Sequence, residues 1–338
     1  MSTGYRDYTA KVLVVGDLIL DRYLTGTVER MSPEFDDVPI LRVEREILAA
    51  GGAANVAMNA RALGAEVDIV GIAGIDGEYV QLSGILIQNG IDPNGVVTSK
   101  HGGTTTKTRL IKRYGNEEKE KHLVRIDRDI SAEVALLEIT RLQNRVNQRV
   151  KDKDVIICSD YGLGVINPVM MDSVRSHKNR SKCIVIVDPK SDDYSRYRGA
   201  DIITPNVEET RMIIGRSFAI HDNSECKTAA SNIYHRTKIP WVVLKRGCYG
   251  ISLYGYLDQY YHYPAITDCP RDVCGAGDTA VAMLAVELAR GSLITRATRR
   301  ANIAAGLSVR KAKTAVVSME EVDQWERSDR REQGYDPS

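Results

Sequence analysis

The sequence has no long apolar run, no excess of charge of one sign and no paired cysteine motif. Every apolar stretch is far shorter than the ~20 residues that cross a bilayer as a helix. The first nine residues lack the apolar core of a signal peptide. The 46 Lys and Arg residues nearly balance the 45 Asp and Glu residues, so no bulk charge attracts nucleic acid or an anionic membrane. We expect a cytoplasmic protein that binds neither nucleic acid nor membrane.

Two further absences exclude classes of site. The six cysteines include no C-x-x-C pair and no histidine at zinc-ligand spacing, which predicts reduced thiols and no structural zinc. The first apolar strand runs into Gly16-Asp17-Leu18, and this is not the G-x-G-x-x-G motif that a dinucleotide-binding oxidoreductase needs there. Neither an internal repeat nor a low-complexity segment is found.

The most informative stretch is the glycine-rich turn Asp272-Val273-Cys274-Gly275-Ala276-Gly277-Asp278-Thr279, which leads into an apolar helix. Its glycines allow backbone N–H groups to converge, and the positive end of the helix adds to the field, so the turn suits an anion. Asp278 would repel a bound phosphate unless it accepts a proton from an attacking hydroxyl, which points to phosphoryl transfer. The alternative is that Asp278 only caps a helix over residues 279–290. Cys274 could be reactive in this turn, although a space-filling role is favoured.

The rest of the chain alternates short apolar strands with helical segments from Lys11 to Lys311. This pattern predicts an α/β fold with a doubly wound, mostly parallel sheet flanked by helices. Two β-prone insertions, at about residues 23–48 and 104–127, predict a small β-sheet lid. We expect one domain over residues 1–325, followed by a charged tail over residues 326–338.

Polar residues follow several of the predicted strands, where ligands bind in open α/β sheets. Asp17 and Asp21 could accept hydrogen bonds from sugar hydroxyls, or could serve turn chemistry and solvation. Gly51-Gly52 permits the close approach of a ligand, or simply tight packing. Asn206 and Glu209 have the spacing of a helix capping box as well as that of a ligand-binding pair.

The glycine-rich stretch resembles the Asp-x-x-Gly-Ala-Gly-Asp signature of the ribokinase-like (PfkB) sugar kinases. The likeness extends to Gly16-Asp17, the stretch from Gly51 to Asn55, and the pair Asn206-x-x-Glu209. It implies ATP as co-substrate, Mg²⁺, and Asp278 as the catalytic base. By this resemblance, the anion hole is formed by Gly275, Ala276 and Gly277; the sugar is bound by Asp17, Asp21, Gly51, Gly52 and Asn55; the nucleotide is bound by Asn206, Lys190, Asp272 and Asn302; and the metal is bound by Glu209 through water.

Other motifs are similar to those of bacterial D-glycero-β-D-manno-heptose-7-phosphate kinases of this family, at residues 30–34, 188–190, 197–200 and 204–206. This likeness implies that the product is the heptose 1,7-bisphosphate of ADP-heptose synthesis. The sequence departs from these kinases at Leu163, where they usually have lysine, and at Phe35-Asp36-Asp37. We expect a stand-alone kinase without a nucleotidyltransferase domain. The alternatives are a PfkB kinase for another sugar, sugar phosphate or nucleoside, and a non-catalytic binding protein, which has no use for Asp278.

A basic strand in the second insertion carries Lys107, Arg109, Lys112 and Arg113. Alternate residues of a strand share a face, so Lys107, Arg109 and Arg113 should point the same way. We expect Lys107 and Arg109 to bind the phosphate of a sugar phosphate; the alternative is a solvated edge that discourages strand pairing. The edges and apolar face of a small lid also predict a homodimer formed through the lid.

Overall fold

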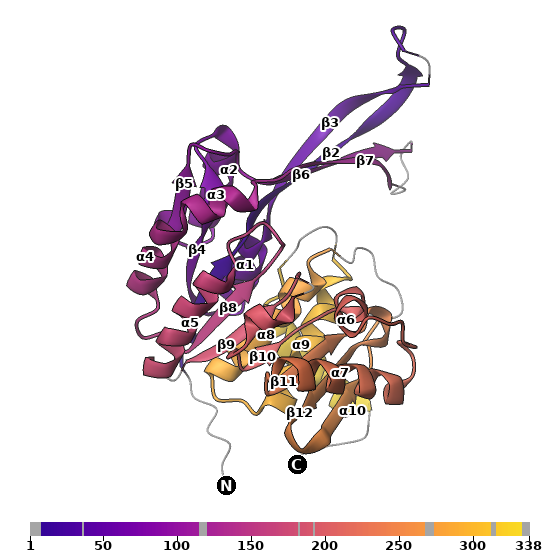
Figure 1. Ribbon diagram of the computed structural model, residues 1–338. Helices are drawn as coiled ribbons and strands as arrows, with labels where there is room; N and C mark the ends of the chain where they lie inside the picture. Colours follow the sequence, from indigo (N-terminus) through magenta and orange to yellow (C-terminus); the bar gives the residue numbers. More distant parts are fainter. Residues whose placement is uncertain are drawn as a thin grey trace.

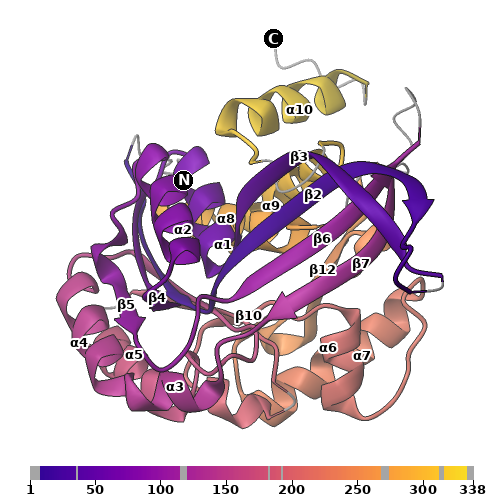
Figure 2. The same ribbon diagram turned by 90° about the horizontal axis from the view of Figure 1, so that it is seen from above.

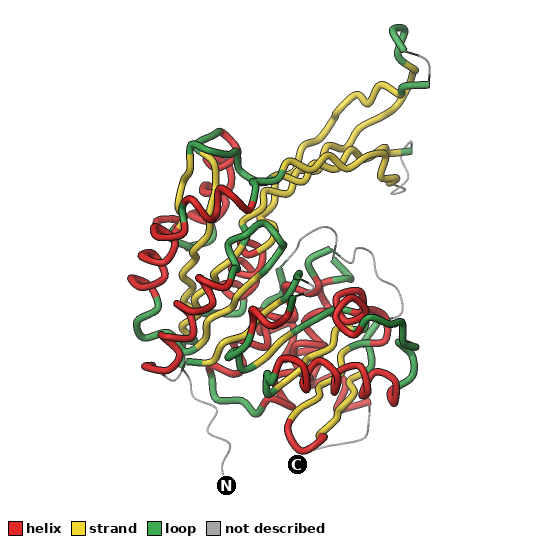
Figure 3. Tube along the Cα trace, in the orientation of Figure 1, coloured by secondary structure: helices red, strands yellow, loops and turns green. Residues whose placement is uncertain are grey.

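The computed structural model describes residues 8–35, 37–114, 120–181, 183–191, 193–267, 274–311 and 316–332. This part of the chain forms a nine-stranded sheet with helices on both faces, and a separate four-stranded sheet that projects from the main body (Figure 1). Figure 3 shows the same division, with the helices confined to the main body. The site discussed below lies where the two sheets meet.

The larger sheet is mostly parallel, as the alternation of strands and helices predicts. The order across the sheet is β13 (Gln259–Tyr263), β12 (Ile251–Gly255), β11 (Trp241–Lys245), β10 (Ile202–Ile203), β9 (Ile184–Asp188), β8 (Val155–Ser159), β1 (Lys11–Gly16), β4 (Glu66–Gly74) and β5 (Val96–Ser99). The seven strands from β11 to β5 in this order run parallel to one another, and β12 and β13 add an antiparallel edge.

Helices bury both faces of this sheet because successive residues of a strand point to opposite sides. Val12 and Val14 of β1 belong to one apolar core, and Leu13 and Val15 belong to the other. The first core is covered by α1 (Ala53–Ala62), α2 (Gly77–Gln88), α8 (Ala276–Ala289), α9 (Ile294–Ser308) and α10 (Met319–Glu332). The second is covered by α3 (Ala132–Leu137), α4 (Ile139–Arg149), α5 (Pro168–Ser181), α6 (Val207–Ile214) and α7 (Asn223–Thr237).

The second sheet has the strand order β3 (Pro39–Gly52), β2 (Leu18–Met31), β6 (Thr106–Arg113) and β7 (Glu120–Arg128). Its two antiparallel hairpins join through a parallel pairing of β2 with β6, and Figure 2 shows the four strands side by side. The small sheet expected from residues 23–48 and 104–127 is therefore present, with longer strands. Only Asp17 separates β1 from β2, so the second sheet grows directly out of the carboxyl end of β1.

Two helical segments have notable ends. Helices α3 and α4 meet at Glu138, whose carboxylate accepts a bond of 2.8 Å from Arg141. The expected start of a tail at residue 326 falls inside α10, where Glu326 bonds to the buried Arg300 at 2.8 Å. This ion pair ties α10 to α9. Among the described helices, none has both the length and the apolar character required to cross a bilayer.

Candidate active site

The glycine-rich turn presents the N-terminus of α8 to the space between the two sheets. Gly275 adopts a left-handed conformation with a φ of 79° directly before Ala276 begins the helix. A side chain there would strain the backbone, so the turn requires glycine. The first N–H groups of an α-helix have no acceptor within the helix itself, so those of Ala276, Gly277 and Asp278 are donors for an anion. Asp272 lies outside the described residues.

Asp278 is buried in the first turn of α8 and does not cap the helix, whose N-cap residue is Gly275. Its Oδ2 accepts a 2.6 Å bond from Asn55 Nδ2 of α1, and its Oδ1 accepts a 2.9 Å bond from the Tyr161 hydroxyl. Burial and the negative charge of Asp188 raise the pKa of Asp278 to about 7, against the opposing effects of the two hydrogen bonds and Lys245. A carboxylate with this pKa is suited to accept a proton near neutral pH.

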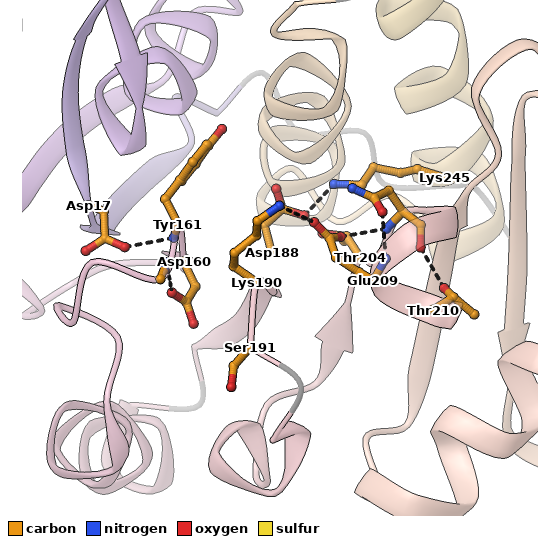
Figure 4. Close-up of polar contacts among 12 residues, drawn as sticks. Asp17, Asp160, Tyr161, Asp188, Lys190, Ser191, Thr204, Glu209, Thr210 and Lys245 are labelled. Atoms are coloured by element: carbon orange, nitrogen blue, oxygen red, sulfur yellow. Dashed lines mark hydrogen bonds and ion pairs between the residues drawn. The ribbon is translucent and has the colours of Figure 1, made fainter. Parts of the chain in front are cut away.

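Asp17 organises the loop that carries Tyr161. Its carboxylate accepts hydrogen bonds from the backbone N–H groups of Tyr161 at 2.7 Å, Leu163 at 3.1 Å and Val165 at 3.1 Å. Burial, with the charge of Asp160, raises the pKa of Asp17 to about 6 despite these three bonds. Figure 4 shows Asp17 directed at the start of this loop. The residue that was predicted to bind sugar therefore also holds Tyr161 against Asp278.

The glycine pair before α1 is required by close packing. A β-carbon at Gly51 would lie 2.3 Å from Asp21 Oδ2, and one at Gly52 would lie 2.4 Å from the backbone oxygen of Asp17. Gly52 also has a φ of 57°, in the left-handed region. The sequence leaves two roles open for this glycine pair, namely ligand approach and tight packing. Tight packing is present, and it places Asp17 and Asp21 close to the start of α1.

The basic strand β6 contributes two of its cations to the same region. Arg109 forms an ion pair of 2.5 Å with Asp21 on the neighbouring strand β2, and its guanidinium lies 5.0 Å from the ring centre of Tyr23. Lys107 places its ammonium group 5.6 Å from the ring centre of Tyr161. Arg113 instead forms an exposed ion pair with Glu44, whereas Lys107 and Arg109 contact Tyr161 and Asp21 of the candidate site.

A second polar cluster lies at the ends of β9 and β11. Asp188 Oδ1 accepts bonds from Lys245 Nζ at 2.5 Å and from the Thr204 hydroxyl at 2.6 Å, as Figure 4 shows. A β-carbon at Gly277 would lie 3.3 Å from Lys245 Nζ, so this ammonium group lies against the first turn of α8. The carboxylate of Asp188 therefore holds a partly buried cation beside the first N–H groups of α8.

The pair Asn206 and Glu209 forms the capping box that its spacing allows. Asn206 Oδ1 accepts from the Glu209 N–H at 2.9 Å, and Glu209 Oε2 accepts from the Asn206 N–H at 2.8 Å. Glu209 Oε1 lies 3.8 Å from Lys190 Nζ. Across the described residues, no group of three or more His, Cys, Asp or Glu side chains could hold a metal ion by itself. One oxygen of Glu209 thus faces the site while the other starts α6.

A cavity of about 540 Å³ opens beside these groups, between α6, α8, α9 and the turn after β11. Its lining includes Asn206, Lys245, Ala276, Gly277 and Asn302, together with apolar residues such as Val207, Ile251 and Ala280. Asn302 Nδ2 donates a 2.7 Å bond to the Pro264 carbonyl. An apolar cavity that ends at a helix N-terminus and a lysine is suited to a nucleotide, with its phosphates towards Asp278.

Sequence reasoning missed three residues of this site, namely Tyr161, Asp188 and Lys245. Each one ends or follows a predicted parallel strand, and the carboxyl ends of such strands meet at one edge of the sheet. For Asp188 the heptose-kinase-like motif at residues 188–190 was a further signal. For Lys245 the position at the end of a strand was the available signal.

The fold and site together define a class of protein, a phosphotransferase of the ribokinase-like type that acts on an alcohol group. The chain belongs to the pfkB family of carbohydrate kinases, whose family model matches residues 9–321. Kinases of this family use ATP as co-substrate, generally with Mg²⁺.

Curated relatives and solved structures agree with this family. The chain is 37% identical over 317 residues to the bifunctional protein HldE of Trichlorobacter lovleyi, covering 94% of this chain and 63% of that protein. It is 36% identical over 310 residues to HldE of Geobacter sulfurreducens, covering 92% and 61%. The chain thus spans about three fifths of the length of these relatives.

Solved structures show the same fold at low identity. Escherichia coli phosphofructokinase-2 in complex with substrates and products matches with a TM-score of 0.73 at 16% identity, over 94% of this chain and 98% of that one. Arabidopsis thaliana ribokinase complexed with ribose and ATP matches with a TM-score of 0.71 at 17% identity, over the same shares of the two chains.

Proposed function

We propose that the chain transfers the γ-phosphoryl group of ATP to the anomeric O1 of D-glycero-β-D-manno-heptose 7-phosphate, giving the 1,7-bisphosphate for ADP-heptose synthesis. The observation that carries the kinase chemistry is Asp278, a buried carboxylate with a pKa of about 7 at the N-terminus of α8. The heptose assignment is supported by the motifs similar to those of heptose-7-phosphate kinases and by the likeness to the HldE proteins.

In this proposal Asp278 accepts the proton of the sugar O1 hydroxyl as that oxygen attacks the γ-phosphorus. The bond from the γ-phosphorus to the bridging oxygen breaks, and ADP leaves. Negative charge on the transferred group is stabilised by the N–H groups around Gly275, Ala276 and Gly277 and by the Lys245 ammonium. Lys245 serves here because it lies against Gly277 and keeps Asp188 as its counter-ion.

The nucleotide occupies the cavity, where Asn206 and Asn302 supply polar contacts, and Lys190 reaches the phosphates from the loop after β9. Mg²⁺, when bound with ATP, neutralises phosphate charge. It commonly keeps several waters and binds through one or two carboxylates and the substrate phosphates. The single site-facing oxygen of Glu209 fits this, with contact to the metal through water.

The sugar phosphate lies between Asp278 and the second sheet. Asp17, Asp21 and Asn55 bind its hydroxyl groups, and the backbone of Gly51 and Gly52 lies against the sugar. Lys107 and Arg109 bind the 7-phosphate from β6, with Asp21 orienting the guanidinium of Arg109 through their ion pair. Arginine suits this role because its planar fork forms charge-assisted bonds with phosphate oxygens. In this arrangement the second sheet closes over the sugar as a lid.

The lid also supports the proposal of a homodimer. Val124 and Ile126 of β7 lie on one face of the second sheet and are 54% and 52% exposed, and Val43 of β3 is 47% exposed. A protruding sheet with exposed apolar side chains and free edges is suited to pairing with a second copy.

The function is tested by measuring ATP consumption with heptose 7-phosphate, the free heptose, fructose 6-phosphate and ribose as acceptors. We expect the highest kcat/KM with heptose 7-phosphate, and a new anomeric phosphate in the ³¹P spectrum of the product. A higher kcat/KM with another acceptor would assign the enzyme to that sugar, and phosphorylation at another position would contradict the anomeric chemistry.

A further inference from the structure

A chain of buried hydrogen bonds connects the two helices that meet at the site. The Thr279 hydroxyl of α8 lies 2.9 Å from Asn59 Oδ1 of α1, Asn59 Nδ2 lies 3.1 Å from Asn55 Oδ1, and Asn55 Nδ2 lies 2.6 Å from Asp278 Oδ2. All four residues are at most 7% exposed. Neither Asn59 nor Thr279 takes part in the proposed reaction, although both lie in the helix interface next to Asp278.

The direction of this chain is fixed by a backbone group. Asn59 Nδ2 also donates a 2.9 Å bond to the backbone oxygen of Asn55, which can only accept. The amide of Asn59 must therefore direct its nitrogen towards Asn55 and its oxygen towards Thr279. Asn55 Oδ1 accepts from the same nitrogen, so the NH₂ group of Asn55 must face Asp278.

We propose that Asn59 is a positioning residue, which acts through Asn55 to hold Asp278 in its ionised, correctly aimed form. The proposal rests on the role of Asp278 as the base. Without Asn59, the Asn55 amide is free to turn and present its oxygen to the carboxylate, which removes a hydrogen bond to the charged form. The other groups that act on Asp278 are Tyr161, Asp188 and Lys245, and they come from other elements that the substitution leaves in place.

The first test is the dependence of kcat on pH in Asn59→Leu, which keeps a similar volume but has no amide. We expect the acidic limb to move to higher pH by about one unit, so that kcat is roughly tenfold lower on that limb and recovers at alkaline pH. Thr279→Val, which removes the outer donor, should move the limb in the same direction by less. Val56→Ala is the matched control, because Val56 is a buried core residue of α1 outside the hydrogen-bond chain. It should lower stability without moving the limb.

The second test observes the Asp278 carboxyl directly by ¹³C NMR without substrate, with its resonance assigned from its loss in Asp278→Asn. We expect its pKa to rise in Asn59→Leu and to stay unchanged in Val56→Ala. A pKa that rises while the kcat profile does not move would refute the base role of Asp278 and leave the positioning role in place. Equal carboxyl pKa values in Asn59→Leu and Val56→Ala would overturn the proposal.

Discussion

Replacing Lys245 with methionine removes the partly buried ammonium group beside the proposed anion hole and keeps an unbranched apolar side chain of similar length. The group lies 2.5 Å from Asp188 and packs against Gly277 in the first turn of α8. Because only 15% of the Lys245 side chain is exposed, solvent screens its charge less than that of a surface lysine, and the charge should act strongly on a transferred phosphoryl group.

Two effects set the size of the loss. Removing one preorganised donor from an anion hole lowers kcat by ~10²–10³. Lys245 also lowers the pKa of Asp278, so its loss should raise that pKa further and reduce the ionised base at pH 7. We therefore expect kcat for Lys245→Met at pH 7 to fall by at least ~10², the lower end of the donor effect. The unpaired Asp188 should in addition destabilise the fold by up to ~3–5 kcal/mol, the value for a broken buried pair.

The assay is steady-state kinetics at pH 7 and pH 9, with urea unfolding to measure stability. Asp188→Asn combined with Lys245→Met should restore much of the stability without restoring kcat. The double variant therefore distinguishes the effect of the lost charge on kcat from the effect of the unpaired carboxylate on stability. The matched control is Lys227→Met, which breaks the exposed ion pair with Asp258 and should leave both stability and kcat nearly unchanged, because solvent screens such a pair. A kcat for Lys245→Met close to that of Lys227→Met would refute the reasoning.

Four other results are expected. Asp278→Asn should lower kcat by ~10²–10⁴ while ATP binding is kept, and a kcat near that of the unchanged protein would exclude the base role. The same variant should raise the melting temperature at pH 8 but not below pH 3.8. Because the pKa of Asp278 is raised in the folded protein, the ionised carboxylate destabilises the fold. This destabilisation is absent below pH 3.8, the pKa in the unfolded chain, and complete above a pH of about 7. Arg109→Ala should raise KM for the sugar phosphate by roughly tenfold or more, the value of a charged hydrogen bond, and leave KM for ATP nearly unchanged; an equal effect on both substrates would contradict it. Light scattering at a protein concentration of roughly tens of micromolar, chosen for a modest interface, should show a dimer. Ile126→Lys should dissociate this dimer, whereas a monomer in the unchanged protein would exclude the lid interface.

The fold could be predicted because each of its parts has a local signal. Short apolar runs such as residues 12–15 are typical of parallel strands, and Gly64, with a φ of 84°, follows the C-cap of α1, where glycine is common. The β-prone insertions predicted the second sheet but not the ends of its strands. β2 begins at Leu18, immediately after Asp17, because its pairing with β3 and β6 extends the strand beyond what local preference indicates.

The environment of Asp278 could not be predicted from the sequence. Its two hydrogen-bond partners, Asn55 and Tyr161, lie 223 and 117 residues away along the chain. Its raised pKa results first from burial, which depends on how α1, α8 and the loop after β8 pack together. Local spacing identified the carboxylate and the glycines, whereas the groups that tune the carboxylate are contributed by separate strands and helices.

Leu163 is the position at which the sequence departs from the heptose-7-phosphate kinase motif, and its surroundings bear on the proposed chemistry. Heptose-7-phosphate kinases usually have lysine there, so the sequence alone indicates a cation lost from the phosphate path. In this chain Leu163 packs against the apolar core that α4, α5 and α7 cover, and its N–H bonds to Asp17. The carboxyl ends of parallel strands meet at one edge of the sheet, so a lysine at the end of another strand can reach the same edge. Lys245 ends β11, pairs with Asp188 and lies against Gly277, and we propose that it supplies the cation for the phosphoryl group in place of the motif lysine.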